Sequence, residues 1–144
     1  MLLVSSTTRD IRRYGYPSRQ PAEVLAVLVD DGSARAVASV AVQEAVARHA
    51  PVRFIQVLSP QLDDGGRSIA EETMFRDGLR ALRGHPRTHT VFEVLRGHAP
   101  ETIRSRSRNA ELLVVGSDAQ RSGRYSLARQ CLNAARCPVR TVPT

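Results

Sequence analysis

The chain has 144 residues, of which 42% are hydrophobic and 24% are charged, and its formal net charge is +7 at pH 7. This length fits one domain that buries its own core without a metal or a disulfide, and the composition excludes a disordered chain. All 21 basic residues are arginine, so a Walker-type phosphate loop, which needs a lysine, is excluded as well.

Residues 1–21 mix polar, basic and turn-forming side chains without a sustained hydrophobic period, so they are predicted to be an N-terminal extension of a domain at 22–144. The pattern changes at Val24, where "VLAVLVD" forms a nearly continuous apolar run that is typical of a central parallel strand covered on both faces. The segment "DGS" ends this strand, and Ser33 is expected to cap a helix over residues 34–49.

Strands and helices keep alternating after this point. In chain order, the further predicted elements are a strand at 51–58, a helix at 67–83, a strand at 88–97, a helix at 99–110, a strand at 111–116, a helix at 126–136 and a strand at 138–143. The strand at 88–97 alternates in a way that leaves one face less buried. Gly78 is expected to weaken the second helix mildly. The buried side of that helix is expected to contain Ile69, Met74 or Thr73, Leu79 and Leu82.

No hairpin signal separates the predicted strands. Strands joined by helices run parallel, and right-handed crossovers then give a single doubly wound α/β sheet with helices on both faces. In such sheets, ligands bind beyond the carboxyl ends of the strands, at the point where the strand order reverses. The segments "VDDGS" and "VVGSD", which end the first and fourth strands, are therefore predicted to lie side by side and to form a ligand site.

The cysteines and histidines form no recognisable metal motif. Cys131 and Cys137 lie six residues apart, which matches no common zinc spacing, so we expect two free and partly buried thiols. The histidines are expected at the surface near the ends of predicted elements; they are His49, His85, His89 and His98. No residue is predicted to ligate a metal.

The distribution of charged and apolar residues narrows the range of partners. The arginines are spread along the chain, and no basic strand carries the aromatic residues that stack on RNA bases, so nucleic-acid binding is not predicted. No segment has the roughly 18 consecutive apolar residues of a membrane span, and the first residues lack the apolar stretch of a secretory signal. We therefore expect a cytoplasmic protein that does not enter the membrane.

Five segments together resemble the universal stress protein family, over roughly residues 22–143. They are "VLAVLVDDGS", "VRFIQVLSP", "VLRGHAPETI", "ELLVVGSDAQRSGRYS" and "CPVRTVP", and the separation of "VVGS" from "CPV" is the most specific feature. The resemblance implies a five-stranded parallel sheet in the order 3-2-1-4-5, ATP or AMP bound between strands one and four, and a role in stress response or regulation. It implies no enzyme beyond slow, incidental nucleotide hydrolysis.

The resemblance also implies a homodimer. The last strand, at 138–143, ends the sheet in the implied order, and its outer edge would expose unpaired backbone groups. Pairing with a second copy covers them.

The family's nucleotide site carries over to particular residues of this chain. An Asp at the end of the first strand meets the adenine-ribose end, and this is Asp30 or Asp31. Val57 falls at the base-lining position, and Gly116 is the first glycine of a phosphate loop of pattern G-x2-G-x9-G-[ST]. The nucleotide-binding residues implied in this way are Asp30, Asp31, Gly32, Ser33, Val57, Gly116, Ser117, Arg121, Gly123, Arg124 and Ser126. Any Mg²⁺ would accompany the nucleotide.

The phosphate loop departs from the family pattern. The second glycine is replaced by Ala119, and the final Gly-Ser pair falls on Tyr125 and Ser126 in a loop about four residues shorter. A Cβ at such positions obstructs the close approach of backbone to phosphate, although Arg121 and Arg124 supply positive charge. We therefore predict a degenerate site at which nucleotide binding is weak or lost. The alternative is a dimeric interaction module of the same fold that works without nucleotide.

Overall fold

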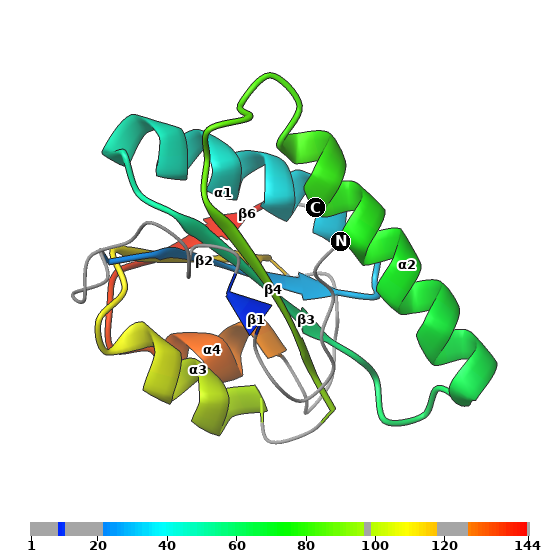
Figure 1. The fold of residues 1–144 in the computed structure, drawn as a ribbon. Helices are drawn as coiled ribbons and strands as arrows, with labels where there is room; N and C mark the ends of the chain where they lie inside the picture. Colours follow the sequence, from blue (N-terminus) through cyan, green and yellow to red (C-terminus); the bar gives the residue numbers. More distant parts are fainter. Residues whose placement is uncertain (1–8, 11–21, 97–98, 118–126, 144) are drawn as a thin grey trace.

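Strands and helices alternate along the described part of the protein, which is residues 9–10, 22–96, 99–117 and 127–143 of a computed structural model (Figure 1). The strands are β1 (Arg9–Asp10), β2 (Val24–Val29), β3 (Val52–Val57), β4 (Thr90–Leu95), β5 (Leu112–Gly116) and β6 (Val139–Val142). The helices are α1 (Ala34–Arg48), α2 (Asp64–Ala81), α3 (Ala99–Ser107) and α4 (Leu127–Ala134).

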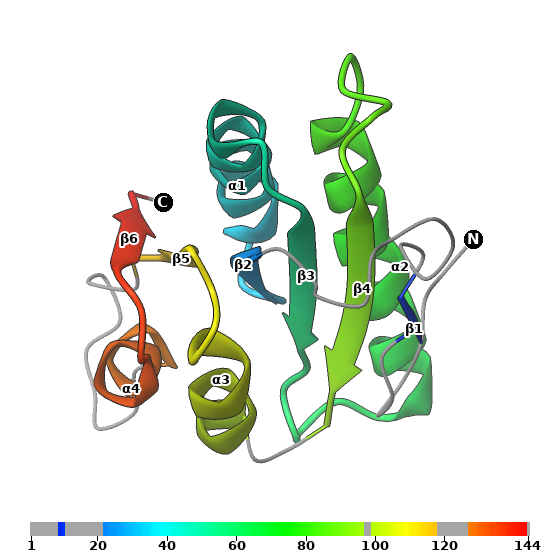
Figure 2. The same cartoon turned by 60° about the vertical axis from the view of Figure 1, so that its left-hand side comes forward.

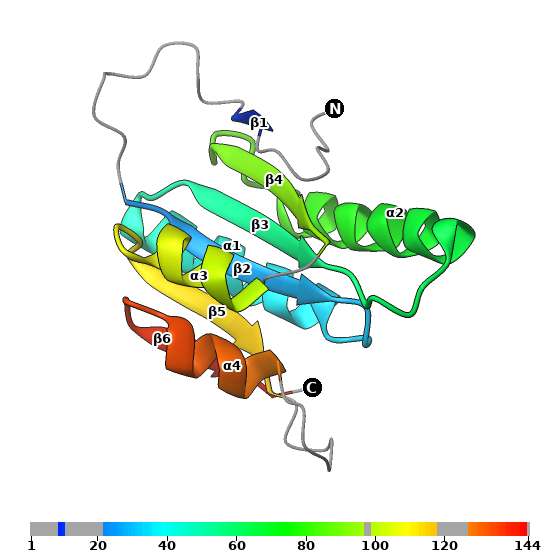
Figure 3. The same cartoon turned by 90° about the horizontal axis from the view of Figure 1, so that it is seen from below.

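The strands form one six-stranded sheet in the order β1-β4-β3-β2-β5-β6. The strands from β2 to β6 run parallel, which confirms the predicted doubly wound sheet of order 3-2-1-4-5. Helices α1 and α2 cover one face of the sheet, and α3 and α4 cover the other (Figure 2, Figure 3). The direction of winding reverses between β2 and β5, so the carboxyl ends of these two strands mark the switch point of the fold.

A short strand from the N-terminal region extends the sheet beyond the five predicted strands. Arg9 and Asp10 of β1 pair antiparallel with Phe92 and Val91 of β4, and β1 lies along the outer side of β4 (Figure 3). The predicted extension therefore contributes an edge strand to the sheet. A two-residue segment is too short to show a hydrophobic period, so β1 could not be predicted from the sequence.

Two apolar clusters, one on each face of the sheet, hold the layers together. The first lies between the sheet and the helices α1 and α2 and includes Leu28, Phe54 and Met74. The second lies between the sheet and the helices α3 and α4 and includes Ile55 and Ile103. β2 contributes to both clusters, as expected for a central strand that is covered on both faces.

Helix α2 packs against the sheet through a different face from the predicted one. Its buried residues are Met74, Phe75 and Gly78, whereas Ile69 and Leu79 are 69% and 45% exposed. The prediction of Met74 was right, and the predictions of Ile69 and Leu79 were wrong. The apolar residues of α2 are too sparse to define one stripe, so the contact with the sheet decides which face is buried.

Gly78 is required for this packing. A Cβ at Gly78 would lie 2.9 Å from Cε1 of Phe92 and 3.3 Å from Cε2 of Phe54. The two phenylalanine rings stack with a centroid separation of 5.0 Å, so the helix approaches them where it has no side chain. The glycine that was expected to weaken α2 is therefore what allows the helix to lie close to the sheet.

Strand β4 is buried on both faces, contrary to the prediction of one less buried face. All of its residues are buried, because α2 packs over one face and α3 over the other. This position places the carboxylate of Glu93, whose side chain is 2% exposed, inside the α3 layer. Glu93 forms ion pairs there with Arg53 at 3.4 Å and with Arg106 at 2.6 Å.

Candidate functional site

Six of the predicted site residues lie at the carboxyl ends of β2 and β5; they are Asp30, Asp31, Gly32, Ser33, Gly116 and Ser117. Val27 of β2 lies opposite Val115 of β5 in the parallel ladder, so the residues that follow both strands emerge side by side. After β2 the chain turns through Gly32, whose φ is +90°, and enters α1. A positive φ is readily adopted by glycine, so Gly32 permits the sharp turn from strand to helix.

Gly116 joins the end of β5 to the beginning of α1. A Cβ on Gly116 would lie 3.0 Å from both Cβ and Oγ of Ser33 and 3.4 Å from Cγ2 of Val37. The next residue, Ser117, donates its backbone N–H to the carbonyl of Val142 at 2.7 Å. Gly116 was predicted as the first glycine of a phosphate loop; what the structure shows is that it lets β5 pass close to the first turn of α1.

The two aspartates that follow β2 have different environments. Oδ1 of Asp31 accepts hydrogen bonds from the backbone N–H of Ser33 at 3.0 Å and from its hydroxyl at 2.5 Å. Asp31 therefore stabilises the turn. Asp30 is exposed and lines a groove, and among the described residues no hydrogen bond or ion pair engages its carboxylate. Of the two candidates, Asp30 is thus the one that faces a ligand-sized space.

Ser33 does not cap α1 as predicted. It occupies the N-cap position, but its backbone is already helical, with φ −85° and ψ −15°, and its side chain makes no capping hydrogen bond. The hydroxyl is instead bound to Asp31. The hydroxyl of Ser33 thus bonds to a residue two positions before it, in place of the backbone N–H groups of the first helical turn that an N-cap side chain usually binds.

A groove of about 410 Å³ opens beyond the end of β2, between the start of α1 and the helix α2. Its lining residues are Val29, Asp30, Gly32, Ala34, Leu62, Gly66, Ile69, Ala70, Thr73, Met74 and Asp77. Volumes of this size are typical of sites for small organic ligands. The groove contains Asp30 and Gly32 from the predicted set.

The α2 wall of this groove was missed by the sequence analysis. Thr73 was considered for the helix core, and Asp77 was not singled out; both line the groove. They are four residues apart and therefore share one side of the helix, a spacing that could have indicated a polar face. Burial raises the pKa of the Asp77 carboxyl, and the neighbouring Arg80, Arg35 and Arg76 act in the opposite direction.

Val57, the predicted base-lining residue, does not line the groove. It is the last residue of β3 and lies opposite Val29 of β2 and Leu95 of β4. Its side chain packs against the apolar cluster on the α3 and α4 side of the sheet. Val57 therefore lies at the correct end of the sheet, with its side chain directed to the face opposite the groove.

The remaining predicted phosphate-binding residues lie outside the described part of the chain. They are Arg121, Gly123, Arg124 and Ser126, together with Ala119 and Tyr125, which replace the family's glycines. Within the described residues, no three His, Cys, Asp or Glu side chains are grouped so as to hold a metal ion. Among these residues, neither Cys131 nor Cys137 forms a disulfide; the first is buried and the second half-buried. Each of the described helices is too short or too polar to span a bilayer.

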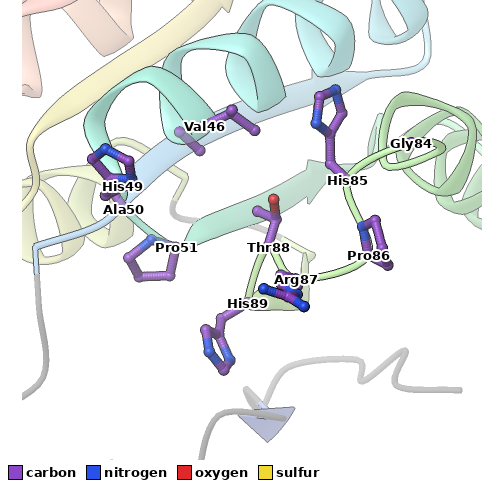
Figure 4. Close-up of a pocket in the computed structure, with 11 residues that line it drawn as sticks. Val46, His49, Ala50, Pro51, Gly84, His85, Pro86, Arg87, Thr88 and His89 are labelled. Carbon is purple, nitrogen blue, oxygen red and sulfur yellow. The ribbon is translucent and has the colours of Figure 1, made fainter.

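A second pocket, of about 480 Å³, lies at the amino ends of β3 and β4 (Figure 4). It is lined by the end of α1 at His49 and by the segment that precedes β4, including His85, Arg87 and His89. His49 and His89 are exposed and His85 is half-buried, close to the surface positions expected for them, and His98 lies outside the described residues. None of the predicted nucleotide-binding residues that the structure describes lines this pocket.

The fold and the groove define a class of protein. The chain is a doubly wound α/β domain whose ligand-sized groove opens beyond the carboxyl end of the central strand, beside the switch point, which is where ligands bind in this class. Comparison with models of protein families finds no match.

Two curated relatives from Mycobacterium tuberculosis are similar to the chain in sequence. They are Universal stress protein MT3220 from strain CDC 1551 / Oshkosh and Universal stress protein Rv3134c from strain ATCC 25618 / H37Rv. Each is 34% identical to this chain over 133 residues, which cover 85% of this chain and 49% of the relative. The chain therefore spans about half the length of the curated relatives that it matches.

Solved structures with the same fold carry the same family name. The universal stress protein from Archaeoglobus fulgidus superposes with a TM-score of 0.63 at 21% identity, covering 85% of this chain and 98% of that one. The universal stress protein from Archaeoglobus fulgidus in complex with dAMP gives a TM-score of 0.61 at 22% identity, covering 85% of this chain and 97% of that one. A universal stress protein in complex with cAMP gives 0.66 at 17% identity, covering 87% and 98%. The chain belongs to the universal stress protein family, as its motifs indicated.

Proposed function

We propose that this domain is a stress-response regulator that binds an adenine nucleotide weakly beyond the carboxyl ends of β2 and β5, and that it is not an enzyme. The observation that carries the proposal is the groove of about 410 Å³ that contains Asp30 and Gly32. Two structures with the same fold were solved with dAMP and cAMP, which supports an adenine nucleotide as the ligand here. The proposed place of action is the cytoplasm.

The nucleotide would extend from the groove toward the end of β5. Gly32 and Ala34 of the groove flank Ser33, and Ser33 lies against Gly116. The start of α1 therefore connects the groove with the point where the phosphate loop begins. Backbone N–H groups at a helix start favour anions, and any Mg²⁺ would arrive with the phosphates.

The proposed affinity is low because the phosphate loop lacks two of the family's glycines, at Ala119 and Tyr125. Each lost charge-assisted phosphate contact costs roughly 1.5 to 3 kcal/mol, so losing two converts micromolar binding to tenth-millimolar binding or weaker, on the order of a hundredfold or more. The base and ribose contacts are shared by ATP and AMP. We therefore expect little preference between the two nucleotides.

Calorimetric titration of the whole chain with ATP and with AMP tests this function. We expect similar dissociation constants of about 0.1 mM or above for both nucleotides. Asp30→Ala should weaken the binding of both. The matched control is Asp64→Ala, which removes an exposed carboxylate from α2 and should leave the binding of both unchanged. Sub-micromolar binding of ATP with strong discrimination against AMP would contradict the degenerate site. Absence of binding by either nucleotide would favour the alternative, an interaction module that works without nucleotide.

We also propose that the protein is a homodimer paired through β6. This strand ends the sheet on one side, and the described chain pairs with it only through β5. Its central residues Arg140 and Thr141 are exposed. An edge of this kind presents unpaired backbone donors and acceptors, and antiparallel pairing with a second copy satisfies them.

A further inference from the structure

The pocket at the amino ends of β3 and β4 lies at the opposite end of the sheet from the groove beside β2, and the two share no lining residue. It has a volume of about 480 Å³ and is formed by the last turn of α1, the connection to β3 and the segment that leads into β4 (Figure 4). The proposed nucleotide does not reach this pocket. A ligand that binds here would therefore be a second one.

The polar side chains of this pocket can all donate hydrogen bonds. They include three imidazole rings and one guanidinium group, from His49, His85, His89 and Arg87. Among the residues that the structure describes, no aspartate or glutamate lines the pocket, and no three His, Cys, Asp or Glu side chains are grouped so as to hold a metal ion. An arginine is always positively charged, and an imidazole offers an N–H group even when it is neutral. This lining favours an anion over a cation.

The rest of the lining is mostly apolar. It includes the side chains of Ala45, Val46, Ala50, Pro51 and Pro86, and Val46 is 38% exposed. An inorganic anion would leave this surface in contact with water, whereas the apolar part of an organic anion covers it. The pocket therefore fits a small organic anion better than a bare ion.

The backbone that carries these side chains is held in place without a ligand. The N–H of His85 donates to the carbonyl of Leu82 at 2.9 Å, and the N–H of Thr88 donates to the carbonyl of His85 at 3.2 Å. The N–H of Val52 donates to the carbonyl of His89 at 2.9 Å, which joins the segment before β4 to the beginning of β3. The two walls of the pocket are thus fixed relative to each other.

The side chains differ in where they point. Figure 4 shows His85 and Thr88 projecting toward α1, whereas the ring of His89 points away from that helix. Among the described residues, no hydrogen bond or ion pair engages the side chains of His49, His85 or Arg87. These three side chains are therefore available to a ligand.

His49 has an unusual backbone conformation at the edge of this pocket. It is the C-cap of α1, with φ 53° and ψ 39°, and among the described residues it is the only one besides glycines with a positive φ. Glycine is the residue that most often takes such a position, because it has no Cβ to oppose a positive φ. A histidine here makes the helix end less stable than a glycine would, which indicates a role for the imidazole ring itself.

We propose that this pocket binds a small organic carboxylate, in which Arg87 pairs with the carboxylate group and the rings of His49 and His85 donate hydrogen bonds to the ligand. A guanidinium group engages a planar carboxylate through two parallel hydrogen bonds. One arginine matches the single charge of a carboxylate better than the double charge of a phosphate. This site is independent of the proposed function, because the groove for the nucleotide lies at the other end of the sheet.

The test compares phenylacetate with phenylacetamide, which has nearly the same shape and no charge. The chain has four histidines, so the ring C–H signals in proton NMR spectra of the whole chain report on the site, and one histidine-to-glutamine variant for each residue assigns them. We expect phenylacetate to shift the signals of His49 and His85 with a dissociation constant of about 1 mM, as is typical of a ligand of this size. Phenylacetamide and inorganic phosphate should each bind at least about tenfold more weakly.

Two variants separate the site from general attraction to a basic protein. Arg87→Gln should weaken phenylacetate about tenfold, whereas Arg83→Gln, which removes an exposed arginine from the same connection outside the pocket, should leave binding unchanged. His49→Gly should weaken phenylacetate several-fold and, unlike a change that merely damages the fold, should raise the melting temperature by about 2 to 4 °C.

Several results would overturn the proposal. One is the absence of any histidine shift at about 10 mM phenylacetate, ten times the expected dissociation constant. Equal binding of phenylacetamide would remove the role of charge, and equal binding of phosphate would remove the role of the apolar surface. Equal losses in Arg87→Gln and Arg83→Gln would show attraction to net charge only. A lower melting temperature in His49→Gly would mean that the ring serves the fold and not a ligand.

Discussion

Arg106 of α3 donates two parallel hydrogen bonds to the carboxylate of Glu93 in β4, from Nε to Oε1 at 3.0 Å and from Nη2 to Oε2 at 2.6 Å. This two-point geometry is the strongest arrangement available to an arginine and a carboxylate. Arg53 adds a contact of 3.4 Å to the same carboxylate and also donates to Glu23 at 3.0 Å. The ion pair of Arg106 with Glu93 therefore holds α3 against the sheet, and it neutralises a carboxylate charge whose burial in an apolar layer would otherwise be unfavourable.

Replacing Arg106 with alanine should destabilise the domain by about 1 to 3 kcal/mol, because the buried carboxylate of Glu93 would lose a two-point ion pair. The arginine side chain is 35% exposed, so the loss should stay below the 3 to 5 kcal/mol or so of a fully buried pair. Urea denaturation measures the change. Arg104→Ala, which removes an exposed arginine from the same helix, should have almost no effect, and equal losses in the two variants would argue against the pair.

Gln56 should be replaceable by methionine with a gain in stability. Its side chain is fully buried, and neither atom of its amide has a hydrogen-bond partner among the described residues. An unsatisfied buried polar group costs about 1 to 3 kcal/mol, and an apolar side chain of similar shape avoids that cost. Gln56→Met should therefore raise the free energy of unfolding by about 1 kcal/mol or more, whereas the exposed Gln43→Met should not. A loss of stability would mean that the amide is satisfied in solution.

A side chain at Gly116 should disturb both packing and ligand binding. The added Cβ would meet Ser33 at 3.0 Å, so Gly116→Ala forces the end of β5 away from α1 at a cost of about 1 to 3 kcal/mol. Gly65→Ala is the matched control, because its Cβ would have no neighbour closer than 3.7 Å and alanine favours the helix. Thermal unfolding separates the two: the first variant should melt lower and the second at the same temperature or higher.

Glu44 should contribute to stability at neutral pH and lose that contribution in acid. Hydrogen bonds from Arg48 and from Arg140 lower the pKa of its carboxyl. Because the folded-state pKa is lower than the unfolded one, the contribution is present above the ordinary value of 4.5 and disappears as the pH falls through the lowered pKa. Glu44→Gln should thus reduce stability at pH 7 and have less effect near pH 3. The control Glu72→Gln changes a side chain that is 72% exposed and should alter stability little at either pH. An equal effect of Glu44→Gln at both pH values would contradict this assignment.

Pairing through β6 should be sensitive to a charge on that edge. Analytical ultracentrifugation at tens of micromolar, an order-of-magnitude concentration for an association of this kind, should show a dimer. Thr141→Lys places like charges near each other across the two-fold axis and should shift the equilibrium toward monomer. Ser105→Lys, at an exposed position of α3, should not. A monomer in the unaltered protein would overturn the proposed dimer.

The order of the strands could be predicted because alternating helices and strands leave few arrangements of a parallel sheet. The core of β2 was equally readable, since a run of apolar residues in a central strand is buried on both faces. The buried face of α2 could not be predicted, because Gly78 allows a close approach to the sheet but adds no hydrophobic side chain to the pattern. The α2 wall of the groove was missed because the position of the sheet against the helix decides whether Thr73 faces the core or the solvent.

Because Arg9 and Asp10 pair with β4, the two edges of the sheet differ in whether a second copy of the chain can pair with them. An α/β sheet with both margins bare could join copies on either side, and repeated joining would build an open filament. Here β1 occupies the margin beside Val91 and Phe92, so addition of a further copy there would first have to displace a strand of the same chain. Growth at this margin is thus hindered, and in the dimer proposed above, pairing through β6 would close after two copies. A segment with no recognisable pattern of its own would then limit the size of the assembly.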